Sequence, residues 1–282
     1  MVNLKKFKKY LESTTISKAS INARMSDVNI YFKQFNELND KNLESFVHDM
    51  VGKYDSKTIA RRVSSLKKYA KFANIPIGDV DIPKQTRKIP HVLSEAEMDT
   101  LIYKAMNIDR NDGFDMLTTQ VMIMLFAHMI RRQGVLDIRD KDIDFENNVV
   151  FIKNKGGDVI SKAIMFGMDK IKEYIELKKK MNIKCEYLLV RKYGLHWKRL
   201  QAREMYSLLY SFTQIVLGKK VNPHQFRHSI ASTMLDHGAN LRLLQEMLNH
   251  KDISTTQIYT HVSKQSERNA YRDYFPMVNK YA

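Results

Sequence analysis

The first quarter of the chain has apolar residues at intervals of three or four positions, the spacing that gives a helix one apolar face. Four such segments span residues 4–13, 17–35, 40–54 and 55–73. Lys and Arg occupy many of the other positions, so each helix is expected to bury one face and expose a basic one. The pattern predicts a helical N-terminal domain over residues 1–75.

The helical pattern ends in a stretch of mixed charge with no helical period. Three of the five prolines in the chain lie there, and they are Pro76, Pro83 and Pro90. Ser94 and Glu97 then match the Ser-x-x-Glu pattern of a capping box at a helix start. These features predict a linker over residues 76–93 and a second domain over residues 94–282.

The second domain combines helical periods with short β-rich runs. Residues 113–130 are apolar enough to form a central helix. Residues 148–153 and 158–166 are β-rich and flank the turn signal NKGG, and residues 186–190 are expected to add a third strand. With the rest helical, the fold is predicted to be mainly α with a small β-sheet.

A helix that is predicted to start at Pro223 carries the first chemical motif. Its apolar face is formed by Phe226, Ile230, Met234 and Leu235. His224 and Arg227 are three positions apart, so they share one face of the first turn and can reach one anion together. The guanidinium fork of arginine also matches the geometry of a phosphate.

Two further residues follow at short intervals. A short helix over residues 240–249 is predicted to deliver His250 at its end. Ser254 or Thr255 can cap the next helix, which contains Tyr259. The order and close spacing of the set predict a phosphate-binding site with a tyrosine nucleophile beside it.

The stretch from His224 to Val262 resembles the C-terminal signature of the tyrosine recombinases, a family that includes the Xer proteins, those of archaea among them, and phage-type integrases. The family usually reads HxLRHxxAT, LGH and TxxYxH in that order, and this chain reads HQFRHSIAS, LNH and TQIYTH. HxxR alone, or a lone tyrosine, occurs in many unrelated proteins. The joint order, spacing and flanks of the three motifs carry the resemblance.

The resemblance predicts two more residues upstream, and both are present. The family's first arginine lies in a pattern like GLRxxELxxLxxxDI, and MIRRQGVLDIRDKDID aligns with it when Asp142 and Ile143 form the final pair. This alignment places Arg131 on the motif position. The family lysine lies in a β-hairpin turn, often GKG, and Lys155 falls on that position.

Three positions depart from the family pattern. Gly134 replaces the usual acidic residue, Met129 replaces a glycine, and Asn249 replaces the glycine of LGH. If the acid braces the active site, Gly134 leaves that role to another group or unfilled. The departures motivate the hypothesis of a DNA-binding protein that keeps the fold and has lost efficient catalysis.

The chemistry of the reaction needs a nucleophile, positive charge on the non-bridging oxygens and a proton for the leaving oxygen. Tyr259 would attack the phosphorus and form a covalent phosphotyrosine. Arg131 and Arg227 would bind the non-bridging oxygens in place of a metal ion. Lys155, at the hairpin tip, would protonate the leaving 5′ hydroxyl.

Two histidines complete the predicted catalytic set. A tyrosine has an ordinary pKa near 10 and must lose its proton during attack, and the resemblance assigns His224 to accept it. His250 would hydrogen-bond the phosphate. No cluster of carboxylate, Cys or His ligands has metal-site spacing, so neither a metal ion nor another cofactor is expected.

The composition fits a protein that handles DNA. The 282 residues include 47 Lys and Arg against 31 Asp and Glu, and this basic balance attracts a polyanion. Residues 1–90 contain 18 Lys and Arg and 9 Asp and Glu, so they carry a net charge of +9 out of the +16 of the chain. Charge alone would also fit an RNA-binding or membrane-surface protein.

The resemblance implies that the N-terminal domain is a helical, SAM-like domain that clamps DNA, and that the second is an α+β catalytic domain. Candidate DNA contacts in the first are Lys57, Arg61, Arg62, Lys67 and Lys68. The alternative for each is an ordinary solvated helix face. Which of them read bases does not follow from the sequence, because contacts to phosphate outnumber contacts to bases.

The remaining features concern location. A single cysteine, Cys185, allows no internal disulfide, which favours a reducing compartment. The N-terminus lacks the apolar run of a signal peptide, and no stretch approaches the length of a membrane span. A cytoplasmic protein with no membrane partner is expected.

The last residues form a short amphipathic pattern that ends near Pro276. In the family that the chain resembles, a C-terminal helix docks on a neighbouring protomer. This likeness predicts that Tyr271, Tyr274 and Phe275 join such a contact. The alternative is a helix that folds back on its own domain.

The sequence thus predicts a two-domain, Xer-like site-specific tyrosine recombinase. Its expected partner is double-stranded DNA with a specific recombination site, bound by a homotetramer on two sites, with a monomer or dimer when free. By that likeness it would resolve chromosome or plasmid dimers through a Holliday junction. The alternatives are an integrase of a mobile element, a DNA-binding member with weakened catalysis, and a nicking-closing topoisomerase.

Overall fold

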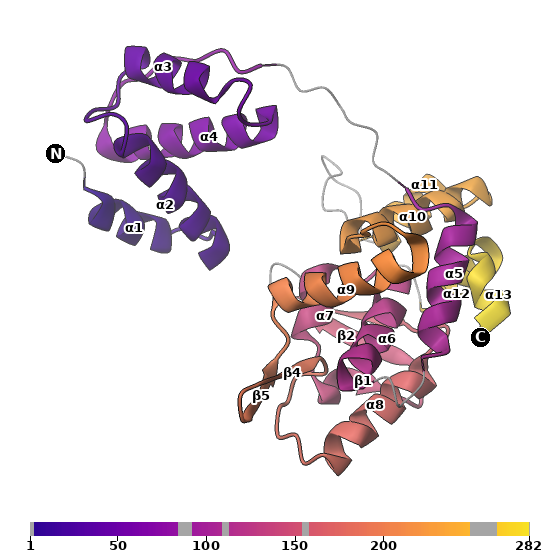
Figure 1. The fold of residues 1–282 in the computed structure, drawn as a ribbon. Helices are drawn as coiled ribbons and strands as arrows, with labels where there is room; N and C mark the ends of the chain where they lie inside the picture. The colour runs from indigo at the N-terminus through magenta and orange to yellow at the C-terminus, as the bar shows by residue number, and fades with distance from the viewer. Residues whose placement is uncertain (1–2, 84–91, 109–112, 154–157, 249–263, 282) are drawn as a thin grey trace. The chain divides into compact units, whose positions relative to one another are not determined.

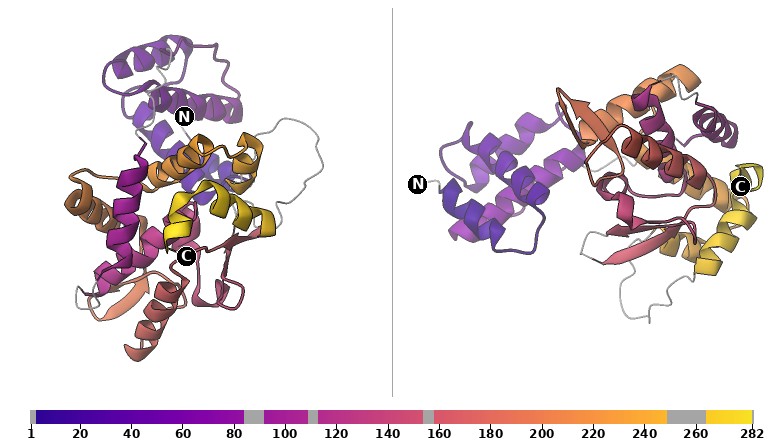
Figure 2. Two further views of the ribbon diagram at one scale, coloured as in Figure 1. Left: turned by 90° about the vertical axis from the view of Figure 1, so that its right-hand side faces the viewer. Right: turned by 90° about the horizontal axis from the view of Figure 1, so that it is seen from below.

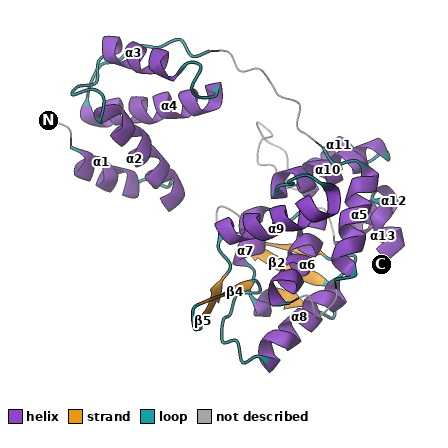
Figure 3. Ribbon diagram, viewed as in Figure 1, coloured by secondary structure: helices purple, strands orange, loops and turns teal. Residues whose placement is uncertain are grey.

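The structure is a computed structural model that describes residues 3–83, 92–108, 113–153, 158–248 and 264–281 (Figure 1). The chain divides into two compact units, Met1–Ile89 and Pro90–Ala282. Helices make up most of both units, as the colours of Figure 3 show. The predicted fold class, mainly α with small β-sheets, is confirmed.

The N-terminal unit consists of four helices. They are α1 (Leu4–Glu12), α2 (Lys18–Phe32), α3 (Asp40–Met50) and α4 (Ser56–Ala73). Each begins after a side chain that accepts a hydrogen bond from the backbone three positions later. These N-cap residues are Asn3, Ser17, Asn39 and Asp55. The local sequence therefore sets where each helix starts.

Aromatic rings dominate the core of the N-terminal unit. The rings of Tyr31 and Phe46 meet edge to face at 5.1 Å, as do those of Phe7 and Tyr69. The chain after α4 stays on this core, where the apolar side chains of Ile77, Val80 and Ile82 pack. These three residues lie in the stretch that the prolines assign to the linker.

The C-terminal unit is built around α6 (Phe114–Ala127), in which every residue from Leu117 onward is buried. This central helix packs against α5 (Glu95–Met106), α8 (Met168–Lys180), α9 (Ala202–Leu217) and α10 (Pro223–Asp236). The Ser94 capping box that starts α5 is present as predicted. The apolar run at 113–130 is explained by burial on all sides.

A three-stranded antiparallel sheet lies beside these helices, with the order β1 (Ile143–Asp144), β2 (Val149–Lys153) and β3 (Val159–Ala163). The third strand is therefore β1 and not the predicted run at 186–190. Leu188 and Leu189 in that run are buried, yet the backbone nitrogen of Leu188 donates to the carbonyl of Ile138 instead of joining this sheet.

A second, two-stranded sheet pairs β4 (Val190–Tyr193) with β5 (His196–Arg199). Residues 196–199 were expected to be helical, and this expectation is wrong. Gly194 has φ of 58°, a left-handed conformation that glycine adopts without strain, and so the chain can reverse between the two strands.

The C-terminal helices fold back on their own unit. Figures 1 and 2 show α12 (Lys264–Tyr274) and α13 (Pro276–Tyr281) in yellow, and α12 packs against α10 and β3. Tyr271 and Phe275 are fully buried in the core of this unit, and Tyr274 packs against it. The single chain thus shows the fold-back arrangement, and the contact with a neighbouring protomer stays a prediction.

None of the described helices is long and apolar enough to span a membrane.

Candidate active site

Two arginine side chains from distant parts of the sequence meet in the C-terminal unit. Arg131 follows α6 and is the N-cap residue of α7 (Arg132–Asp137). Arg227 lies on the first turn of α10, which starts with an Asn222 capping box. Arg131 Nη2 donates to the carbonyl oxygen of Leu248 at 2.8 Å, and Arg227 Nη2 donates to the same oxygen. The two guanidinium groups therefore converge on one oxygen atom, just after α11 (Leu241–Met247).

Burial concentrates this positive charge. Arg227 is partly buried, and burial together with the charge of Arg131 lowers its pKa to about 10. Burial also lowers the pKa of Arg131. Arg227 nevertheless stays charged at neutral pH. Two like charges at close range favour an anion between them, and a phosphate offers one oxygen to each fork.

Arg227 donates a second hydrogen bond to the backbone of Met129. Its carbonyl oxygen accepts from Arg227 Nη1, and its own side chain is fully buried. Met129 has φ of 54°, in the left-handed region that few residues other than glycine adopt. The family's glycine is thus replaced at a backbone position that favours glycine, and we attribute the tolerance to the packing of the methionine side chain in the core.

Gly134 occupies a position with no space for an acid. A Cβ atom there would lie 2.9 Å from Ile152 Cγ2 and 3.2 Å from Ile130 Cγ2. Strand β2 therefore packs directly on α7, and a carboxylate side chain does not fit between them.

His224 stands on the same turn as Arg227, at an exposed position. Partial desolvation lowers its pKa, and the charges of Arg132, His228, Arg227 and Arg131 lower it further. The lowered pKa favours the neutral imidazole. A neutral imidazole can accept a proton, as the predicted role requires.

Three predicted catalytic residues, Lys155, His250 and Tyr259, lie outside the described residues, as does Asn249. Their roles stay predictions. Among the described residues, Arg131, His224 and Arg227 are the predicted catalytic residues that the fold brings together.

Lys162, which belongs to none of the predicted motifs, lies close to the arginines. Lys162 on β3 is 5% exposed, and its Nζ donates to Glu267 Oε1 and to the carbonyl of Met247, each at 2.7 Å. Burial lowers its pKa, Glu267 raises it, and the charges of Arg227 and Arg131 lower it further. The sequence did hold a signal, because Lys162 lies in a predicted strand opposite the buried Val150.

Among the candidate DNA contacts of the N-terminal unit, Lys57 and Arg61 are exposed, whereas Lys67 and Lys68 are half-buried. Lys57, Arg61 and Lys68 share one face of α4, because they are four and seven positions apart. Arg61 also pairs with the buried Asp27. Lys67 pairs with Asp79.

Arg62 is a packing residue and not an exposed contact. It is 8% exposed, its guanidinium lies 4.1 Å from the centre of the Tyr54 ring, and its Nη1 is 3.4 Å from the sulfur of Met50. The sequence could not separate it from Arg61, because the two are adjacent and only the helix rotation decides which one points inward.

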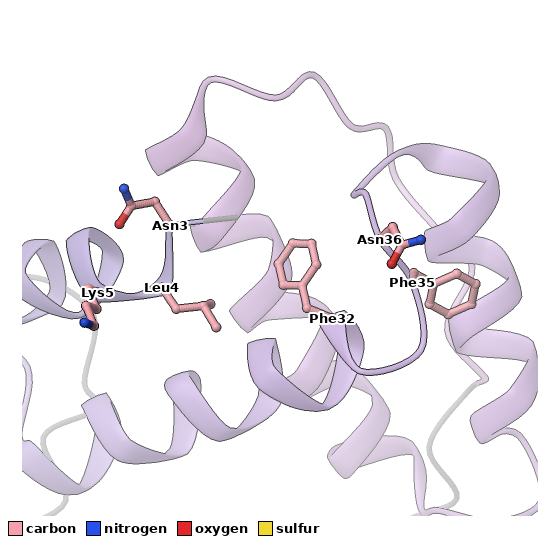
Figure 4. A pocket seen from close by; sticks show the side chains of 6 residues that line it. All are labelled: Asn3, Leu4, Lys5, Phe32, Phe35 and Asn36. Carbon is pink, nitrogen blue, oxygen red and sulfur yellow. The ribbon is translucent and has the colours of Figure 1, made fainter. Parts of the chain in front are cut away.

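A surface hollow in the N-terminal unit contains none of the predicted site residues (Figure 4). Its lining is formed by Asn3, Leu4, Lys5, Phe32, Phe35 and Asn36. A mostly apolar lining with one lysine does not match a phosphate site.

Comparison with known proteins decides the family. The model of the Phage integrase family matches residues 91–266, which include Arg131 and Arg227. The chain belongs to the phage integrase family. It is 32% identical over 236 residues to the tyrosine recombinase XerD of Oceanobacillus iheyensis, covering 78% of this chain and 76% of that protein. It is 28% identical over 300 residues to the tyrosine recombinase XerC of Lacticaseibacillus casei, covering 97% and 98%.

Solved structures share the fold. The XerH site-specific recombinase bound to a palindromic difH substrate matches with a TM-score of 0.67 at 18% identity, covering 98% of this chain and 82% of that one. The integrase of transposon Tn1549 in complex with circular intermediate DNA matches with a TM-score of 0.67 at 17% identity, covering 95% and 99%. The predicted resemblance is confirmed, and the chain is a Xer-like tyrosine recombinase, a DNA strand-exchange enzyme.

Proposed function

We propose that this recombinase cuts and rejoins double-stranded DNA at a specific site, with Arg131 and Arg227 as its phosphate clamp. The observation that carries the proposal is their convergence on the carbonyl oxygen of Leu248. Two guanidinium groups that reach one oxygen atom can also reach the two non-bridging oxygens of one phosphate. Their charge would stabilise the negative charge that develops during attack on the phosphorus.

The proposed chemistry has two balanced steps. The phenolic oxygen of Tyr259 attacks the phosphorus, and the bond from phosphorus to the 5′ oxygen breaks. His224 takes the phenolic proton, Lys155 gives a proton to the leaving 5′ oxygen, and His250 donates a hydrogen bond to the phosphate. The 5′ hydroxyl of the other strand then reverses these steps. Because the 3′-phosphotyrosine keeps the bond energy, rejoining needs no nucleotide.

The proposed biological role is Xer-type resolution of chromosome or plasmid dimers in the cytoplasm. The relatives named XerC and XerD, which the chain matches over most of its length, support this role. The XerH structure with its DNA substrate supports double-stranded DNA as the partner. The proposed assembly is a homotetramer on two sites that exchanges strands through a Holliday junction.

We further propose that the face of α4 with the exposed Lys57 and Arg61 and the half-buried Lys68 contacts the DNA backbone in this assembly. The basic charge of the N-terminal residues supports this. Lys67 remains a candidate whose pairing with Asp79 competes with phosphate.

Covalent trapping on nicked suicide DNA substrates tests the function. Candidate sites come from DNA fragments that the protein retains from a genomic library. Wild type in buffer with a metal chelator is expected to form a covalent adduct, and Tyr259→Phe is expected to form none while binding equally well. Tight, sequence-specific binding without any adduct would instead favour the DNA-binding member with lost catalysis. Relaxation of any supercoiled plasmid, without site preference, would favour a topoisomerase.

A further inference from the structure

A buried ion pair joins three elements close to the two arginines. Lys162 Nζ on β3 reaches Glu267 Oε1 on α12 at 2.7 Å, and the side chains are 7% and 9% exposed. Glu267 Oε2 also accepts from the backbone nitrogen of Ala163 at 3.4 Å. The same ammonium donates to the carbonyl of Met247 at the end of α11.

The carbonyl that Lys162 holds is next in the sequence to the carbonyl that the two arginines hold. Met247 precedes Leu248, whose carbonyl receives both Arg131 and Arg227. Consecutive carbonyl groups are therefore held by the lysine and by the arginine clamp. Glu267 lies in the first turn of α12, the next described helix of the chain. One ammonium group thus ties the last turn of α11 and the first turn of α12 to the same strand.

We propose that Lys162 is a positioning residue for strand cleavage. It fixes the point where the chain leaves α11 and the point where it enters α12, relative to Arg131 and Arg227. His250 and Tyr259 lie between these points in the sequence, so their reach toward the phosphate depends on both ends being held. The proposal rests on the roles proposed above for His250 and Tyr259.

Stability alone is a poor explanation for this pair. The desolvation of two buried charges offsets most of their attraction, and apolar residues of similar volume often replace such pairs at no loss of stability. An apolar pair could not, however, donate to the carbonyl of Met247. Proton donation to DNA is not its role either, because the buried ammonium of Lys162 already donates to Glu267 and Met247.

The same unit offers a control lysine. Lys178 on α8 is 1% exposed, pairs with both carboxylate oxygens of Asp140 at 2.8 Å, and donates to the carbonyl of Tyr187 at 2.7 Å. Its ammonium is buried and donates to a carboxylate and a backbone carbonyl, as that of Lys162 does, although the Asp140 side chain is 34% exposed. None of its partners belongs to the arginine clamp.

The test compares Lys162→Met and Lys162→Met/Glu267→Leu with Lys178→Met and Lys178→Met/Asp140→Leu. Three quantities are measured, namely Tm, DNA affinity, and the single-turnover rate of adduct formation at saturating suicide substrate. Lys162→Met is expected to lower the rate by about a hundredfold with little change in affinity, the scale of a small misplacement of reacting groups. The Lys162→Met/Glu267→Leu double variant is expected to regain Tm but not the rate. Both Lys178 variants are expected to keep the rate.

A double variant that regains the rate together with Tm would overturn the proposal, as would an equal loss of rate in the Lys178 control. Hydrogen exchange gives a readout that does not depend on cleavage. Lys162→Met is expected to increase exchange in α11 and in the first turns of α12 together, and Lys178→Met in neither. Unchanged exchange in both helices would refute the claim that Lys162 holds them in place. A wild type that forms no adduct would refute only the proposed function.

Discussion

The stability of the catalytic unit should depend on pH through one buried histidine. His128 follows α6, three positions before Arg131, and is fully buried. Its Nε2 accepts from the backbone nitrogen of Met165 at 2.8 Å, so its Nδ1 carries the proton that bonds the carbonyl of Met124 at 2.7 Å. Its ring also lies 5.7 Å from that of Tyr271 on α12. The neutral imidazole thus links α6, the chain after β3 and the C-terminal helix.

The direction of the effect follows from the pKa. Burial lowers the pKa of His128 from its ordinary value of 6.5 to about 4, and only the bond to Met124 opposes this. The unfolded chain therefore binds a proton at a pH where the folded chain does not. Stability is fully present above pH 6.5 and falls as the pH decreases toward 4. Linkage gives a loss of about 2 kcal/mol at pH 5 and about 3 kcal/mol below pH 4.

Urea unfolding of the wild type and of His128→Gln between pH 7 and pH 5 measures this contribution. Glutamine can offer one donor and one acceptor but does not titrate, so the wild type should lose about 2 kcal/mol more than the variant over this range. His237→Gln removes an exposed histidine that pairs with Glu95, and it is the control. If the free energy of unfolding depends on pH equally in the wild type and in His128→Gln, His128 is not the cause of the pH dependence.

Three further predictions concern the site and the DNA surface. Gly134→Ala should destabilise the protein by about 1–3 kcal/mol through overpacking against Ile152, and the loss measured in urea should be less than additive with Ile152→Ala. An additive result would mean that β2 moves away freely. Arg227→Lys should slow adduct formation about a hundredfold, because a lysine lacks the two-pronged fork, with a smaller loss of DNA affinity. A loss confined to affinity would contradict its role in the clamp. Lys57→Gln and Lys68→Gln should each reduce the slope of log affinity against log salt by roughly 0.9, whereas Arg62→Gln should lower Tm. An unchanged slope in both lysine variants would exclude that face of α4.

Local signals in the sequence account for much of this fold. The N-cap side chains at Ser17 and Asp55 and the capping box at Ser94 set helix starts within a few residues, and their partners lie one turn away. The largely apolar run at 113–130 likewise indicates a buried helix without tertiary knowledge. The order and spacing of the motifs identify Arg131, His224 and Arg227, which the fold then brings together.

Features that depend on distant neighbours could not be predicted in the same way. The run at 186–190 has the composition of a strand, but Leu188 donates to the carbonyl of Ile138, a distant partner that the local sequence does not indicate. Arg62 differs from Arg61 only by a helix rotation of about 100°. Lys162 and Glu267 each occupy an inward position in their own element, yet nothing in either local pattern reveals the other, more than a hundred positions away.

Gly134 and the Lys162–Glu267 ion pair both concern whether the site has a carboxylate that supports catalysis. The hypothesis of weakened catalysis rests on a missing acid, but the space beside Gly134 is filled by Ile152, so the acid is excluded by packing. Glu267 brings a carboxylate to Lys162, whose pKa responds to Arg131 and Arg227. Glu267→Gln keeps the size of this side chain and removes its charge. If Glu267 serves the site as the missing acid would, this variant should slow adduct formation at unchanged DNA affinity, and a rate equal to that of the wild type would leave Gly134 as an uncompensated loss.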